Sequence, residues 1–185
     1  AALAQAITGD ASAGPLLAAL ARRNLFTDRR LGEDTSYQFH ALFRLFLQTR
    51  ARHDLGYAEH VRLTNSAAAL LQTTGHFEEA FALYVDAAEW EPAIRLIRDR
   101  AGHLVRQGRR QTLRQWIQSL PMDRFEHDPW VGYWYAVAHL GVDYRLTARA
   151  LERTYEGFEA AGDWAGQVLV ACRKIDISHA VVLVE

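Results

Sequence analysis

The stretch Tyr37-Gln-Phe-His-Ala-Leu-Phe-Arg-Leu-Phe-Leu47 decides the fold of the first third of this 185-residue chain. Its first four residues and the run 25–31 flank a polar segment, 32–36, that contains a glycine. Two short runs around such a loop predict a β-hairpin. From Ala41 to about Asp54 the apolar residues recur at helical spacing and occupy more than one face. We therefore predict a helix there that is covered on two sides.

A second helix is predicted before the hairpin. Pro15 stands where the first turn of a helix tolerates proline, the apolar residues 16–21 continue the pattern, and Asn24 is a residue type that ends helices. Helix, hairpin and helix follow one another in the order of a winged helix. Residues 1–53 are therefore predicted to be the C-terminal part of a winged-helix domain.

After Gly56 the pattern becomes a periodic helical array. Gly75, Gly108 and Gly141 are spaced by 33 residues, and an apolar residue (Ala80, Leu113, Leu146) follows each of them by five positions. A period of 33 to 34 residues with two helices per unit is typical of tetratricopeptide-like solenoids. The predicted fold is thus mainly α: a winged-helix remnant with a short hairpin, then a tetratricopeptide-like helical solenoid over 54–185. Helices are predicted at about 57–73, 77–88, 91–105, 110–119, 129–140, 144–161 and 164–180.

Composition excludes several classes of function. The net charge of −1 and the pI near 6.8 provide no basic field, so no direct contact with nucleic acid is expected. No apolar run approaches the roughly 20 residues of a membrane span. Cys172 is alone, which permits no internal disulfide and suits a reducing compartment, and its helical surroundings predict a buried thiol. We expect an excerpt of a longer cytoplasmic protein.

The sequence contains no catalytic or metal-binding constellation. Its eight histidines are dispersed, and none forms a His-x-x-x-His pair. It has no Gly-x-Ser-x-Gly elbow and no Gly-x-x-x-x-Gly-Lys-Ser/Thr loop. We therefore expect neither enzymatic activity nor a metal or cofactor in this chain.

Two clusters could bind a ligand or simply contribute to the fold. Trp130, Tyr133 and Trp134 share a predicted helix with Tyr135, and Trp116 and Phe125 precede them. Aromatic faces stack on sugar rings and could line an effector or partner groove, but burial in a helix–helix core is the favoured interpretation. A basic stretch could meet an acidic partner or an anionic effector, although a solvated face is favoured. It comprises Arg95, Arg98, Arg100, Arg106, Arg109, Arg110 and Arg114.

The pattern Asn24-Leu-Phe, followed by Tyr37-x-Phe-His-x-Leu-Phe-Arg-x-Phe-Leu47, resembles the winged-helix end of MalT-like, LuxR-type transcriptional regulators. This family is a branch of the signal-transduction ATPases with numerous domains. The run from Ala80 through Trp116 to Pro121 is similar to the start of the family's helical sensor region. The resemblance implies an ATPase core, a winged helix, a superhelical sensor and a C-terminal DNA-binding helix-turn-helix. This chain would hold the winged helix and the beginning of the sensor.

By this resemblance His40 is the candidate nucleotide-sensing residue of the parent protein. It is similar to the histidine of the Met-His-Asp motif in related nucleotide switches, which contacts the β-phosphate of bound ADP and locks the winged helix onto the ATPase core. An imidazole N–H at a helix start suits a phosphate. Phe39 and Ala41 replace the motif's methionine and aspartate. In the alternative interpretation, His40 caps the helix or bonds within the hairpin.

The expected function is regulatory. The resemblance implies a fragment that couples effector sensing to the ATP/ADP switch of the parent protein. Its partners would be the intramolecular ATPase core and a small-molecule inducer or regulatory protein. The alternative is a generic helical-repeat docking scaffold without nucleotide control.

Overall fold

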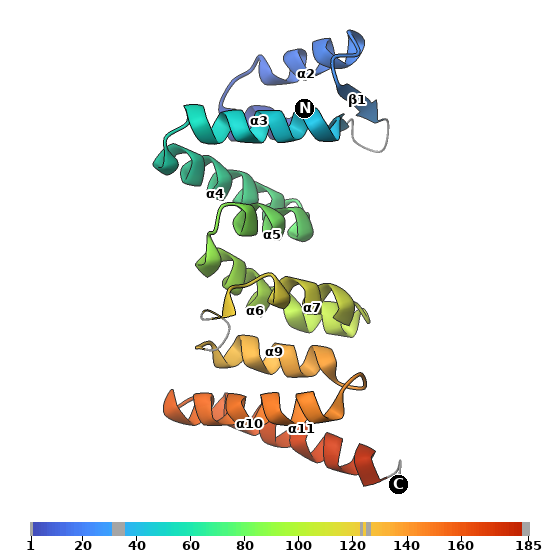
Figure 1. Cartoon of the computed structure of the whole chain (residues 1–185), viewed down its shortest axis with the longest axis vertical. Helices are drawn as coiled ribbons and strands as arrows, with labels where there is room; N and C mark the ends of the chain where they lie inside the picture. The colour runs from blue at the N-terminus through green and yellow to red at the C-terminus, as the bar shows by residue number, and fades with distance from the viewer. Residues whose placement is uncertain (1, 31–35, 123, 125–126, 183–185) are drawn as a thin grey trace. The chain divides into compact units, whose positions relative to one another are not determined.

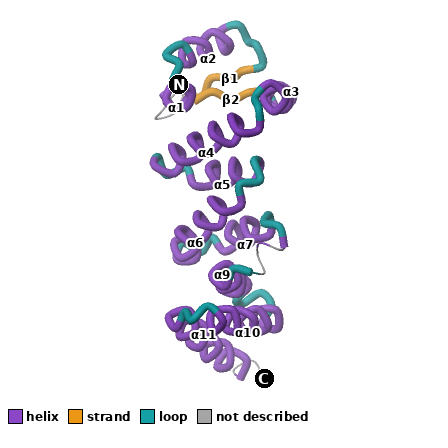
Figure 2. The backbone as a smooth tube through the Cα atoms, turned by 90° about the vertical axis from the view of Figure 1, so that its left-hand side faces the viewer, coloured by secondary structure: helices purple, strands orange, loops and turns teal. Residues whose placement is uncertain are grey.

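The computed structural model describes residues 2–30, 36–122, 124 and 127–182. The chain divides into two compact units, Ala1–Ala88 and Glu89–Glu185. Most of the described residues are helical (Figure 1), and one antiparallel pair forms the only strands among them (Figure 2). None of the described helices is both long and apolar enough to cross a membrane.

The first unit begins with the predicted helix–hairpin–helix order. The strands pair from Thr27 opposite Phe39 to Arg30 opposite Ser36. Residues 31–35, which hold most of the predicted turn, lie outside the described part of the chain. The short helix α1 was not predicted from the sequence. The elements are α1 (Ala2–Thr8), α2 (Ala13–Arg22), β1 (Thr27–Arg30), β2 (Ser36–Phe39) and α3 (Ala41–Asp54).

Helix α2 ends just before Asn24, the residue that was predicted to stop it. Asn24 adopts a φ of 52°, in the left-handed region where asparagine replaces glycine at least cost. Its N–H donates to the carbonyl of Ala21 at 3.1 Å, and the N–H of Leu25 donates to that of Leu20 at 3.0 Å. These two bonds form a Schellman motif, which turns the chain toward β1.

One face of α3 packs on the hairpin and another does not. The Phe43 ring lies 5.6 Å from the rings of both Phe26 and Phe39. On another side of the helix, Leu42, Leu45 and Phe46 are 73%, 59% and 60% exposed. The prediction that α3 is covered on two sides is therefore wrong for this chain, because no described element lies over these three side chains.

Two further helices complete the first unit. Helices α4 (Tyr57–Thr73) and α5 (Phe77–Asp86) pack together and bury Ala68 and Tyr84 among others. The Gln72 side chain donates to the Tyr84 hydroxyl at 2.8 Å across their interface.

The second unit is a series of helices in which each packs on the next (Figure 1). Its core contains Tyr133, Leu151, Phe158 and Val170. The predicted bounds of the helices from 57 onward agree with the structure within two residues. The helices of the second unit are α6 (Trp90–Arg106), α7 (Arg110–Gln118), α9 (Pro129–His139), α10 (Tyr144–Ala160) and α11 (Trp164–Val182).

The glycines spaced by 33 residues mark the ends of helices. Gly75, Gly108 and Gly141 follow α4, α6 and α9 with φ of 83°, 74° and 83°, a backbone conformation that L side chains adopt at a cost. After α4 and α6 the bonds are those of a Schellman motif, as at Asn24. The predicted burial of Cys172 is wrong: this residue of α11 is exposed.

Candidate functional site

His40 is the N-cap residue of α3, at the end of the hairpin. Its backbone N–H donates to the carbonyl of Phe26 at 2.8 Å, and its own carbonyl accepts from the N–H of Arg44 at 2.9 Å. The imidazole is exposed and makes no hydrogen bond that caps the helix. The backbone thus fixes the position of His40 while its ring stays accessible at the start of α3, where a helix favours an anion.

The aromatic residues of α9 that were singled out from the sequence pack into the second unit. Tyr133 is 3% exposed, and its ring meets those of Trp130 and Trp134 edge-on at 6.1 and 5.0 Å. Trp130 also packs edge-on against Phe158 of α10 at 5.0 Å. This location agrees with the core interpretation of the cluster. Phe125, upstream of it, lies outside the described residues.

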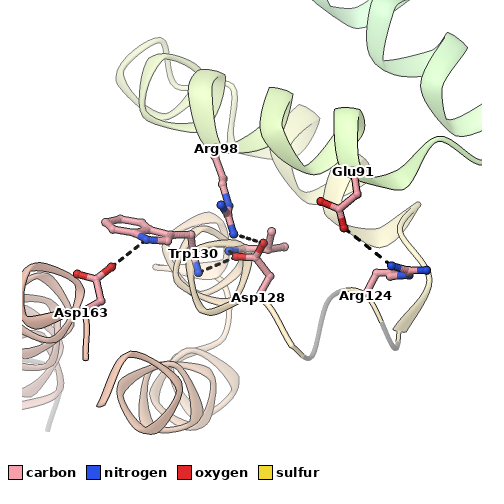
Figure 3. A network of polar contacts seen from close by, with 7 residues as sticks. Glu91, Arg98, Arg124, Asp128, Trp130 and Asp163 are labelled. Atoms are coloured by element: carbon pink, nitrogen blue, oxygen red, sulfur yellow. Dashed lines mark hydrogen bonds and ion pairs between the residues drawn. The ribbon is translucent and has the colours of Figure 1, made fainter. Parts of the chain in front are cut away.

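A polar network surrounds the N-terminus of α9 (Figure 3). The Asp128 carboxylate accepts from the N–H groups of Trp130 and Val131 at 3.0 and 3.2 Å and also from the guanidinium of Arg98. The Trp130 indole donates to Asp163 at 3.1 Å. Arg98 therefore connects α6 to the N-terminus of α9, and its side chain is still 44% exposed, as the predicted solvated face requires.

Another arginine of the basic stretch also supports the fold. Arg114 of α7 donates to the carbonyl of Ala138 in α9 at 2.8 Å and also to the side chain of Gln111. Arg95, in contrast, is exposed. The stretch is thus divided between helix–helix contacts and solvent.

A groove of about 1020 Å³ opens along α9 and α10 in the second unit. Helix α9 contributes Pro129, Gly132 and Tyr135, which lie three residues apart and so share one face. These residues differ from Trp130, Tyr133 and Trp134, which pack into the core. The groove therefore lies on a different face of α9 from the one that carries Trp130, Tyr133 and Trp134.

Glycines let the two helices that line the groove approach each other closely. A Cβ at Gly132 would lie 2.7 Å from the Thr154 hydroxyl oxygen, and one at Gly157 would lie 3.0 Å from Cγ of Pro129. Both glycines line the groove.

The wall of the groove on α10 carries a row of arginines. Arg145, Arg149 and Arg153 all line it, and the spacing of four residues places them on one helix face. Arg145 and Arg149 are exposed, and within the described residues neither makes a hydrogen bond or an ion pair. This row was not predicted from the sequence, where the arginines are more closely spaced over residues 95–114. The recurrence of arginine at i, i+4 and i+8 was the available signal.

The helix–hairpin–helix order of the first unit is that of a winged helix, within a chain that is otherwise helical. The family model of the MalT winged helix domain matches residues 1–59. Residues 1–59 are thus similar to the winged helix domain of MalT, in agreement with the resemblance noted in the sequence. Neither a curated protein nor a solved structure matches it. The match ends within α4, whereas the predicted domain boundary at 53/54 falls before the last residue of α3.

Proposed function

We propose that the chain is the regulatory and interaction part of an ATP-dependent, LuxR-type transcriptional regulator. Residues 1–53 hold the resting, ADP-bound ATPase core of the parent protein. Residues 54–185 form a tetratricopeptide-like sensor that receives a small-molecule inducer or a regulatory protein. Effector binding loosens the winged helix from the core and permits nucleotide exchange.

The observation that carries this proposal is the exposed apolar stripe of α3. Leu42, Leu45 and Phe46 follow one another at helical spacing, and all three are largely exposed to solvent. Such a patch on a domain that matches the MalT winged helix fits a surface that another domain covers. His40 begins the same helix, so docking through the stripe would bring the imidazole close to a nucleotide held by the ATPase core.

The proposed coupling follows from differential binding. An effector shifts a switch only if it binds its two states with different affinities. The sensor must therefore contact the effector better when the winged helix is released. Within the second unit, the successive helices α6, α7, α9 and α10 supply a surface of the kind that helical repeats use for such contacts.

The test is His40→Ala in the full-length regulator. Loss of the phosphate contact should weaken ADP retention and give transcription without inducer. His53→Ala is the matched control, because His53 is an exposed histidine of the same helix about 20 Å from His40 along the helix axis. ADP release and reporter transcription are measured for both variants.

An unchanged requirement for inducer in the His40→Ala variant would remove the nucleotide-sensing role. The rival interpretation, a docking scaffold without nucleotide control, predicts that both variants behave as the unmodified protein. It also predicts that Leu45→Lys leaves ADP retention unchanged. Our proposal instead predicts faster ADP release for this variant, because the lysine would place a charge in the apolar contact between α3 and the ATPase core.

A further inference from the structure

We propose that the groove along α9 and α10 binds an extended acidic segment of a partner protein, whose carboxylates at alternate positions pair with Arg145 and Arg149. This site lies wholly within the second unit. It is independent of His40 and of the nucleotide switch, so either proposal can fail without the other.

The charges of the groove favour an anionic ligand. Its two described carboxylates are already engaged: Asp128 accepts two backbone N–H groups and Arg98, and Asp143 caps α10 by accepting from the N–H of Leu146 at 2.9 Å. The guanidinium groups of Arg145 and Arg149 have no such partner in the described structure. These two positive side chains therefore make no hydrogen bond or ion pair among the described residues, and guanidinium forks match carboxylates in geometry.

The arginine spacing favours an extended chain over a compact anion. Residues four apart on a helix are separated by about 6 Å along its axis. In an extended peptide, side chains on one side repeat every two residues, or about 6.6 Å. The two repeats nearly coincide, so acidic residues at alternate positions meet successive arginines.

The dimensions of the groove agree with this ligand. Its lining runs from Arg145 of α10 to Ala161, the C-cap residue of that helix, a span of about 24 Å along the helix axis. About seven residues of extended chain cover that distance. The volume of about 1020 Å³ is at the upper end of the range for small-molecule pockets. On the same helix as the arginines, Leu146, Ala150 and Gly157 also line the groove and offer small or apolar contacts for the backbone and the remaining side chains.

The test measures binding of a fluorescent heptapeptide, Glu-Ala-Glu-Ala-Glu-Ala-Glu, to the full 185-residue chain. Arg145→Ala and Arg149→Ala should each weaken binding about three- to tenfold, and added salt should weaken it further. Arg95→Ala is the control, because Arg95 is exposed in the same unit but outside the groove lining. Thermal unfolding of each variant verifies that the helices are intact, and Arg149→Lys, which keeps the charge, should lose less affinity than Arg149→Ala.

A second comparison changes the order of residues in the peptide. A peptide with the same composition but four consecutive glutamates should bind more weakly, because its carboxylates lose the alternate spacing. Equal affinity for the two peptides, or equal effects of Arg95→Ala and Arg149→Ala, would overturn the proposal. Full competition by inorganic phosphate would indicate a small-anion site instead. Tighter binding of a single-stranded RNA than of the peptide would indicate a nucleic-acid surface. Either result contradicts the assignment.

Discussion

The indole of Trp130 donates a hydrogen bond to the carboxylate of Asp163 at 3.1 Å. The other oxygen of the same carboxylate accepts from the backbone N–H of Gly166 at 2.9 Å, and so caps the start of α11. At the same time, the backbone N–H of Trp130 donates to Asp128, the N-cap of α9. One tryptophan therefore connects the N-terminal caps of two helices, and it does so through its polar atoms while its rings pack in the core (Figure 3).

Trp130→Phe should lower the free energy of unfolding by about 1 to 2 kcal/mol, because the carboxylate of Asp163 loses a donor within a partly buried contact. Urea denaturation measures the change. Trp164→Phe is the control: Trp164 is 74% exposed, and its replacement should change stability by less than about 0.5 kcal/mol. Equal effects of the two substitutions would show that the Trp130–Asp163 bond contributes nothing.

Gly166→Ala should destabilise the second unit, although alanine is normally the better residue inside a helix by up to about 1 kcal/mol. An added Cβ would lie 2.4 Å from Cδ1 of Phe158, which is buried in the core, so the aromatic ring would have to move. We expect a net loss of about 1 to 3 kcal/mol. The thermal midpoint measures it.

Gly102→Ala is the matched substitution for Gly166→Ala. A Cβ at Gly102 of α6 would lie 3.4 Å from Cη2 of Trp134, close to ordinary van der Waals contact. This variant should therefore be as stable as the unmodified chain or more so. A Gly166→Ala variant that gains stability to the same extent would contradict the close packing of α11 on Phe158.

The two faces of α3 should respond differently to truncation. Phe43→Ala removes a half-buried ring that contacts Phe26 and Phe39, and should lower the free energy of unfolding of the first unit by about 2 kcal/mol. Leu42→Ala removes an exposed side chain and should change it by less than about 0.5 kcal/mol. Urea denaturation, followed by far-UV circular dichroism, compares them. A large loss with Leu42→Ala would indicate that this chain itself covers the stripe.

The helices were predictable because residues near each helix end specify where the helix begins or ends. Gly75 and Gly108 occupy positions that require a positive φ, and Asn24 ends α2 in the same way. Asp128 and Asp143 accept from the first backbone N–H groups of α9 and α10, the ordinary role of an aspartate at an N-cap. Such signals depend on a few neighbouring residues, so the sequence specifies them without knowledge of the tertiary structure.

The faces of the helices were less predictable. Helix α9 is apolar or aromatic nearly all round, so periodicity could not decide whether Trp130 or Tyr135 faces the groove. The exposure of one side of α3 was not predicted for a different reason. Leu42 and Phe46 are apolar, as core residues usually are, but no described element covers them. Cys172 likewise lies on a helix whose pattern suggested burial, yet it is exposed. Which face is covered depends on partners distant in sequence, and local patterns do not encode them.

Asp10, at the turn into α2, gives a test that depends on pH. The hydroxyl of Ser12 donates to its carboxylate at 2.8 Å and the backbone N–H of Ser12 donates at 2.7 Å, and both bonds hold the pKa of Asp10 below its ordinary value, the hydroxyl most of all. Because the folded pKa is the lower one, the stabilising contribution is present above the unfolded pKa. It is lost as the pH falls through the folded pKa, which places the loss below about pH 4.

Carboxyl ¹³C NMR should therefore show Asp10 titrating below its ordinary range. Ser12→Ala should raise that midpoint without restoring it fully, since the backbone donor is kept. Ser119→Ala, whose hydroxyl bonds the Trp116 carbonyl in the other unit, should leave it unchanged. An Asp10 midpoint that is the same with and without the Ser12 hydroxyl would contradict the described turn.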